Sequence, residues 1–188
     1  MSTQQKLLDL GEEYMKERGF GGFSYADVAD AAGIRKASIH HHFPTKADFG
    51  LAVLDRYSDR LAITLGDIKA TSRSGAQALQ GAINLYRTAL SGGSKMCLCA
   101  ALAADASILS EDLRAMLGKA NAMVADWIEQ VLLAGRRDRT IAVSGDPAKE
   151  AWAILAQLQG AQLVAKAGCD ASLFESAIST LEARLHRH

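Results

Sequence analysis

Apolar side chains recur along this chain at the three- and four-residue spacing of α-helices. Near the N-terminus, Leu7, Leu10 and Tyr14 form one such stripe. Period-two alternation, which would predict strands, is missing throughout. The pattern predicts helices at about 3–18, 25–32, 36–42, 46–69, 76–91, 95–108, 111–136, 147–167 and 172–186. We therefore expect an all-α protein of about nine helices.

Residues typical of helix ends bound several of these segments. Capping boxes are predicted at Ser2 with Gln5, Ser24 with Asp27, Thr45 with Asp48, and Ser172 with Glu175. Asp146 before Pro147 predicts another helix start, and Gly33 predicts a helix stop. Residues 71–75 are expected to be a hinge or linker, and 138–144 a loop that could include a brief extended piece.

Composition excludes some classes of protein and leaves others open. Lys+Arg and Asp+Glu are equal at 21 each, so net charge indicates no bulk affinity for nucleic acid or anionic lipid. The longest uncharged run, 151–165, is too short to span a bilayer, and the N-terminus lacks a secretory leader. Three cysteines, an odd number, indicate a reducing compartment. We expect a cytoplasmic protein that needs no cofactor.

The segment "GIRKASIHHHFPTKADF", residues 33–49, has the most distinctive pattern. Ile39 and Phe43 are spaced i,i+4 and so share one face of the helix predicted at 36–42. If that face is buried, the opposite face presents Lys36, Ala37, His40 and His41, flanked by Arg35, Ser38 and His42. Residues 33–46 hold three basic side chains and no acidic one, whereas residues 1–50 hold six basic and seven acidic. The positive charge is therefore local to this face.

Three short apolar stripes with a glycine turn between the last two describe a helix-turn-helix. Arg, Lys, Ser and neutral His supply donors and acceptors for base edges and phosphates. A small residue such as Ala37 lets the helix approach a thymine methyl in a major groove. Thr45 and Lys46 begin the next helix, whose first N–H groups can accept a phosphate oxygen. The alternative, from the residues alone, is a solvated polar helix in an ordinary bundle.

Residues 19–54 resemble the N-terminal domain of the tetracycline-repressor (TetR) family. The shared features are a glycine-aromatic pair, a Ser-led second helix, an A-A-G turn and a K-x-S-hydrophobic segment ending in F-x-x-K. The resemblance implies a helix-turn-helix domain at 1–46 and a helical ligand-binding and dimerisation domain at 47–188. The DNA contacts expected are Ser24, Tyr25, Arg35, Lys36, Ala37, Ser38, His40, His41, Thr45 and Lys46.

This sequence departs from the family pattern at three positions. His40 and His42 stand where tyrosines are usual, and Arg35 stands where a small residue often opens the third helix. The first tyrosine commonly contacts a phosphate in the family, and His40 could do so as a donor with shorter reach. These departures bear on which operator sequence is recognised rather than on whether the chain binds DNA. Consecutive helical residues point about 100° apart, so we expect no metal site in the histidine run.

The C-terminal part is richer in apolar residues than one surface layer needs. Small residues at 100, 101, 103 and 104 would leave room for a small, largely apolar molecule between helices. Its expected walls are Tyr86, Leu102, Met116, Met123, Trp127 and Trp152, although a filled core would use the same residues. The resemblance implies that the last two helices pair with their copies, giving a homodimer and a near-palindromic operator.

These observations predict a ligand-responsive transcriptional regulator, a repressor released from its operator by a small molecule. One alternative is a thiol-based sensor of oxidants or electrophiles that acts through Cys97 in "KMCLCAAL", where Lys95 could lower a thiolate pKa. Buried cysteine acting as a small hydrophobe is the simpler interpretation. A helical enzyme or carrier is a further alternative. The chain shows no catalytic Ser/His/Asp set, paired carboxylates or metal-ligand spacing, so we expect no enzyme.

Overall fold

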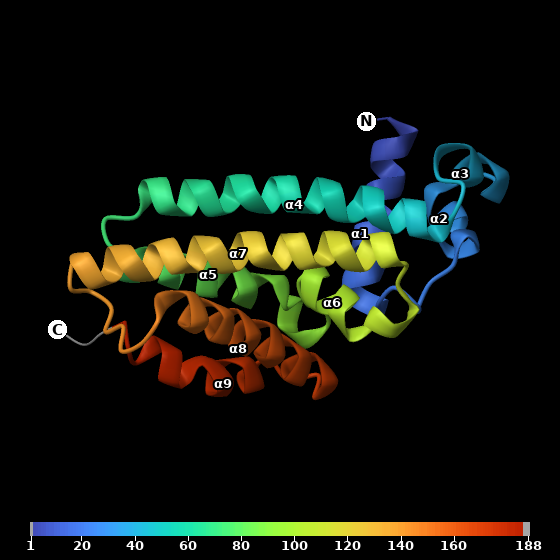
Figure 1. Cartoon of the computed structure of the whole chain (residues 1–188). Helices are drawn as coiled ribbons and strands as arrows, with labels where there is room; N and C mark the ends of the chain where they lie inside the picture. The colour runs from blue at the N-terminus through green and yellow to red at the C-terminus, as the bar shows by residue number, and fades with distance from the viewer. Residues whose placement is uncertain (1, 186–188) are drawn as a thin grey trace. The chain divides into compact units, whose positions relative to one another are not determined.

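The computed structural model describes residues 2–185 of the chain. Within that range there are nine α-helices, two 3-10 helices and no strand (Figure 1). The helices are α1 (Thr3–Arg18), α2 (Tyr25–Ala32), α3 (Lys36–His42), α4 (Lys46–Thr71), α5 (Gly75–Ala89), η1 (Ser91–Gly93), α6 (Leu98–Ala104), η2 (Ala106–Ile108), α7 (Glu111–Arg137), α8 (Pro147–Ala167) and α9 (Ser172–Glu182). The prediction of an all-α protein is confirmed.

Most helix starts follow from local capping. The box of Ser2 and Gln5 and the box of Ser24 and Asp27 both form at the starts of α1 and α2. Thr45 and Asp48 exchange the same pair of bonds at the start of α4. The Asp146 carboxylate accepts from Ala148 N–H at 3.0 Å before α8. Gly33 ends α2 in the left-handed conformation, with φ of 70°, as its sequence position predicts.

The helix predicted at 95–108 is shorter in the structure. Gly92 and Gly93 adopt φ of 71° and 94° and turn the chain after α5. The backbone N–H of Cys97 then donates to the side chain of Gln162 at 3.0 Å, and α6 begins only at the next residue. Asp105 leaves the helical conformation, so 106–108 forms a separate 3-10 turn.

The capping box predicted at Ser172 and Glu175 is wrong. Ser172 is the first residue of α9, and the N-cap residue before it, Ala171, makes no side-chain capping hydrogen bond. Instead the Asp170 carboxylate accepts from Ser172 N–H at 2.8 Å. Hydrogen bonds from the side chain of Ser172 and from its backbone N–H lower the pKa of Asp170. α9 ends at Glu182, although residue 186 of the predicted span lies outside the described residues. The loop expected at 138–144 contains no extended piece.

The chain divides into two compact units. Unit 1 comprises Met1–Arg60 and Leu98–Ala120, and unit 2 comprises Leu61–Cys97 and Asn121–His188. α4 and α7 each contribute residues to both units. The functional boundary expected between residues 46 and 47 is a different division, and it stays a prediction.

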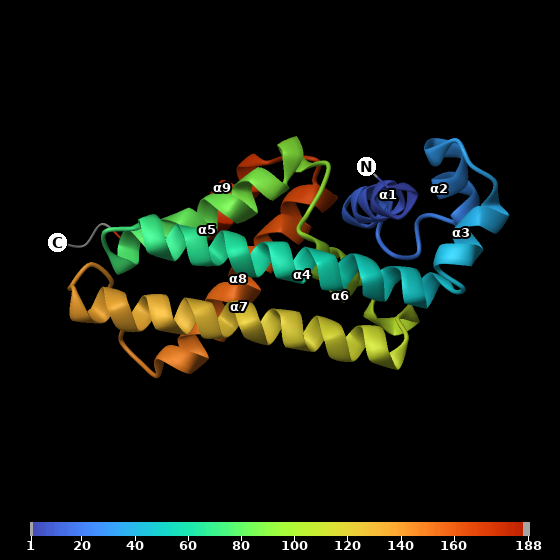
Figure 2. The ribbon, with the colours of Figure 1, turned by 90° about the horizontal axis from the view of Figure 1, so that it is seen from above.

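An aromatic cluster forms the core of unit 1. The ring of Phe49 is fully buried, with its centroid 4.9 Å from that of Phe43 and 5.8 Å from that of Tyr25. A Cβ on Gly11 would lie 2.3 Å from Phe49 Cζ, so α1 packs on this ring only because residue 11 is glycine. Burying one such phenyl ring contributes about 2–3 kcal/mol. The cluster fixes α1, α2 and α3, which we call the reading head (Figure 2).

In unit 2, α8 and α9 lie side by side (Figure 1). Between residues 2 and 185, Gln162 on α8 is the one polar side chain among those buried. Its carbonyl oxygen accepts from Cys97 N–H at 3.0 Å, and its amide donates to the carbonyl of Tyr86 at 2.7 Å. Gln162 thus ties α8 to the last turn of α5 and to the residue that precedes α6.

Over the described range, no helix carries an apolar stretch long enough to cross a bilayer.

Candidate nucleic-acid interface

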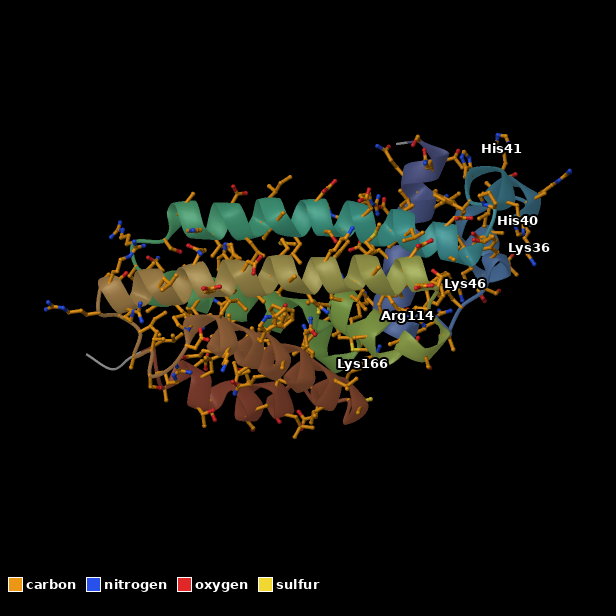
Figure 3. All side chains as sticks on the ribbon, viewed as in Figure 1. Lys36, His40, His41, Lys46, Arg114 and Lys166 are labelled. Carbon is orange, nitrogen blue, oxygen red and sulfur yellow. The ribbon has the colours of Figure 1, made fainter. Side chains whose placement is uncertain are left out.

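The two faces of α3 differ in burial as the sequence predicts. Ile39 is fully buried and Phe43 is 4% exposed. Lys36, His40 and His41 are exposed, as are Arg35, Ala37 and Ser38 around them. In Figure 3 the labelled side chain of His41 extends outward from the α3 ribbon. The predicted burial of Ile39 and Phe43 is confirmed, so this polar face is open to a partner.

Four of the expected DNA contacts line one hollow of about 620 Å³ on unit 1. These are Arg35, Ala37, Ser38 and His41, and the other lining residues are Thr3, Ile34 and His42. The sequence did not point to Thr3, because only packing brings the first turn of α1 beside α3. His42 was recognisable as a polar residue next to the exposed face. The hollow is concave and carries donors on its wall, which suits a phosphate backbone.

His40 is oriented by the turn that follows α3. Its Nδ1 lies 3.1 Å from the carbonyl oxygen of Pro44, and its ring centroid lies 4.9 Å from that of Tyr25. A carbonyl can only accept, so Nδ1 carries the hydrogen in this contact. Nε2 is then an acceptor while the ring is neutral and a donor once it is protonated. A contact between His40 and a phosphate stays a prediction.

Tyr25 is buried, with 6% of its surface exposed. Its hydroxyl lies 3.0 Å from the carbonyl of Phe43 and 2.6 Å from that of Thr45, and it donates to this pair. Burial raises the pKa of Tyr25 to about 12, and the charge of Asp48 adds to the effect. The neutral hydroxyl thus fastens α2 to the turn between α3 and α4. A contact between Tyr25 and DNA stays a prediction.

Lys46 directs its ammonium toward the loop before α2. The Nζ donates to the carbonyl of Phe23 and lies 4.2 Å from the centroid of that ring and 5.0 Å from that of Phe20. Burial lowers the pKa of Lys46, while the charges of Asp105 and Asp27 act in the opposite direction. Lys46 therefore stabilises unit 1 from within. Its contact with a phosphate stays a prediction.

The hydroxyls of Ser24 and Thr45 are engaged in capping. Each donates to a carboxylate at 2.7 Å, Ser24 to Asp27 and Thr45 to Asp48. Both residues are exposed, so each hydroxyl can still accept a second hydrogen bond. Their expected role in DNA contact stays a prediction.

The residues expected to wall a ligand pocket fall in both compact units. Leu102 and Met116 belong to unit 1, and Tyr86, Met123, Trp127 and Trp152 belong to unit 2. Leu102 and Tyr86 are buried, and the indole N–H of Trp127 donates to the carbonyl of Leu65 at 2.9 Å. Trp152 is 50% exposed, more than a pocket wall needs. A pocket formed by this set stays a prediction.

The three cysteines differ in exposure. Cys97 and Cys99 are buried and Cys169 is exposed, and none of the three takes part in a disulfide. Cys97 lies just before α6 rather than inside a helix that includes Cys99.

Comparison with known proteins relates the whole chain to one family. The family model for bacterial regulatory proteins of the tetR family matches residues 7–53. The repressor NemR of Escherichia coli strain K12 is 30% identical over 182 residues, covering 94% of this chain and 90% of NemR. The regulator CymR of Pseudomonas putida is 42% identical over 55 residues, covering 29% of this chain and 27% of CymR.

Solved structures agree over nearly the full length. A TetR-family regulator from Agrobacterium tumefaciens has a TM-score of 0.91 and 26% identity, covering 97% of each chain. The reduced form of Escherichia coli NemR has a TM-score of 0.82 and 28% identity, covering 96% of this chain and 95% of NemR. With its exposed α3 and helical fold, this chain belongs to the tetR family of bacterial regulatory proteins and is a helix-turn-helix transcriptional regulator.

Proposed function

We propose that this regulator is a homodimeric repressor that binds a near-palindromic operator and releases it when a small molecule binds among its C-terminal helices. The observation that carries the proposal is the polar face of α3, which is exposed, contains no acidic residue and rests on the buried side chains of Ile39 and Phe43. Such a face complements the major groove of DNA, which is flanked by anionic phosphates and lined with hydrogen-bond donors and acceptors on the base edges.

The proposed DNA contacts divide into two kinds. Lys36 and Ala37, in the first turn of α3, would meet base edges in the major groove, because the first residues of a recognition helix read bases. Arg35 and His41, on the wall of the hollow, would hold the backbone. Phosphate contacts supply most of the affinity, and base contacts supply the sequence preference.

The outer face of α8 supports a dimer of this chain. Trp152, Ala156, Gly160, Leu163 and Val164 lie on one exposed face, and the three large side chains are 50%, 47% and 54% exposed. The opposite face of α8 is already buried in unit 2. A helix that is apolar on both faces needs a second partner. A Cβ on Gly160 would meet no atom within 4 Å, so another α8 can approach closely there.

A two-fold dimer would present two copies of α3 to one face of a duplex, which requires an operator of near two-fold symmetry. Release would follow if the effector favours a conformation with lower DNA affinity. By linkage, operator DNA must then weaken effector binding by the same factor. We also propose a cytoplasmic location, because three cysteines without a disulfide suit a reducing compartment.

Lys36→Ala is the test of the DNA interface. The variant should bind duplex DNA more weakly and show a weaker base preference. The magnitude of the slope of log affinity against log salt concentration should fall by about one. Fluorescence anisotropy over a salt series measures the affinity, with a duplex that the native protein selects from a random pool. Lys119→Ala is the control, because it removes an exposed lysine on α7, away from the outer face of α8. Native protein with no salt-sensitive affinity for any duplex would contradict the proposal.

A second candidate function is a thiol-sensing form of the same regulator. Two observations favour it: Cys97 lies at the joint before α6, and NemR, similar over nearly the whole chain, has been solved in a reduced form. Under this proposal, peroxide or an electrophile should release native protein from DNA and leave Cys97→Ser bound. Cys169→Ser, which removes the exposed thiol, is the control. Equal release of native protein and Cys97→Ser would contradict thiol sensing.

A further inference from the structure

Asp105, between α6 and η2, contacts the loop that joins α1 to α2. Its Oδ2 accepts from the backbone N–H of Gly21 at 3.0 Å. Gly19 has φ of 81°, and a Cβ there would lie 2.5 Å from the same oxygen. A Cβ on Gly21 would lie 3.1 Å from Ile108 Cδ1. The glycines of this loop thus leave the space that the carboxylate and η2 occupy.

The same carboxylate acts on the start of α4. Its negative charge opposes the effect of burial on the pKa of Lys46, the first residue of that helix. The Lys46 ammonium donates to the carbonyl of Phe23, in the loop that leads into α2. Asp105 therefore influences both segments that flank α2 and α3, one by a hydrogen bond and the other by charge.

Asp105 follows soon after one of the points at which the chain passes from one compact unit to the other. The chain passes from one compact unit to the other within α4, between Cys97 and Leu98, and within α7. The first and third passages run through continuous helix, whereas the second falls just before α6, outside a helix. On one side of it, Gln162 holds the backbone of Cys97. On the other, α6 leads within one short helix to Asp105.

We propose that Asp105 is a positioning residue that fixes the α1–α2 loop, and with it the orientation of α2 and α3, to the end of α6. This inference rests on the DNA-binding function proposed above. The inference identifies Asp105 as the residue through which a displacement of α6 would change the orientation of the reading head. Because Asp105 need not touch DNA, its loss should alter the geometry of binding more than the chemistry of the contacts.

Operator spacing is the measurement that detects such a change. One added base pair between half-sites rotates them by about a tenth of a turn, so a dimer with fixed reading heads discriminates against it. The probe is the duplex that native protein selects from a random pool, together with versions lengthened or shortened by one central base pair. Asp105→Ala should reduce the discrimination between these duplexes by about tenfold. Asp105→Asn should recover most of it, since its carbonyl oxygen can still accept from Gly21 N–H.

Controls separate positioning from stability. Asp112→Ala, which removes an exposed carboxylate at the start of α7, should keep the native discrimination. If Asp105→Ala does not fold, Asp105→Glu keeps the charge but adds a methylene where Gly19 leaves little room, and it should also relax the spacing preference. Unchanged discrimination in the folded variants, with or without a uniform loss of affinity, would overturn the inference. Native protein that selects no duplex would instead contradict the proposed function.

Discussion

Val164→Glu is expected to give a folded monomer that binds its operator about a hundredfold more weakly than the native chain does. Val164 is 54% exposed in the single chain, so the substitution costs little within one copy. In a two-fold dimer the new carboxylate would be buried close to its own copy without a partner of opposite charge. Binding of one reading head to its half-site would then no longer hold a second reading head at the other half-site.

Light scattering after size exclusion measures the mass, and anisotropy with the selected duplex measures the affinity. Ile63→Glu is the matched control, because Ile63 is a 66% exposed apolar residue on α4 rather than on α8. That variant should remain dimeric and bind like the native chain. A dimeric Val164→Glu with native affinity would show that the outer face of α8 is not the interface.

Gln162→Leu is expected to lower the free energy of unfolding by about 3 kcal/mol. Leucine has a similar volume and fits an apolar site, so packing is largely kept. It leaves the N–H of Cys97 and the carbonyl of Tyr86, both held by Gln162, without that partner. Each buried polar group left without a hydrogen bond costs about 1–3 kcal/mol.

Urea unfolding at a fixed protein concentration measures this loss, because dimerisation makes stability depend on concentration. Gln159→Leu on the same helix is the control. The Gln159 amide donates to Asn121 at 2.9 Å in a partly buried position, where water can replace it, so its loss should cost less than about 1 kcal/mol. Equal losses in the two variants would show that Gln162 contributes no more than an ordinary amide.

Local sequence determined the class of the fold, most helix starts and the two faces of α3. A capping box such as Ser24 with Asp27 closes between residues three apart, so it depends little on the rest of the chain. The burial of Ile39 and Phe43 follows equally from i,i+4 spacing. The local rule failed at α9, where a neighbouring residue competed. The predicted capping box gives the Ser172 N–H to the Glu175 side chain, but the Asp170 carboxylate accepts from it instead.

Only the tertiary structure decided which distant groups meet. It turned the Tyr25 hydroxyl and the Lys46 ammonium onto carbonyls inside unit 1, and it delayed the start of α6 by giving the Cys97 N–H to Gln162. It also brought Asp105 to Gly21. Residue type and spacing state what a side chain can bind, but packing between remote helices decides which partner lies within reach, and that depends on the whole chain at once.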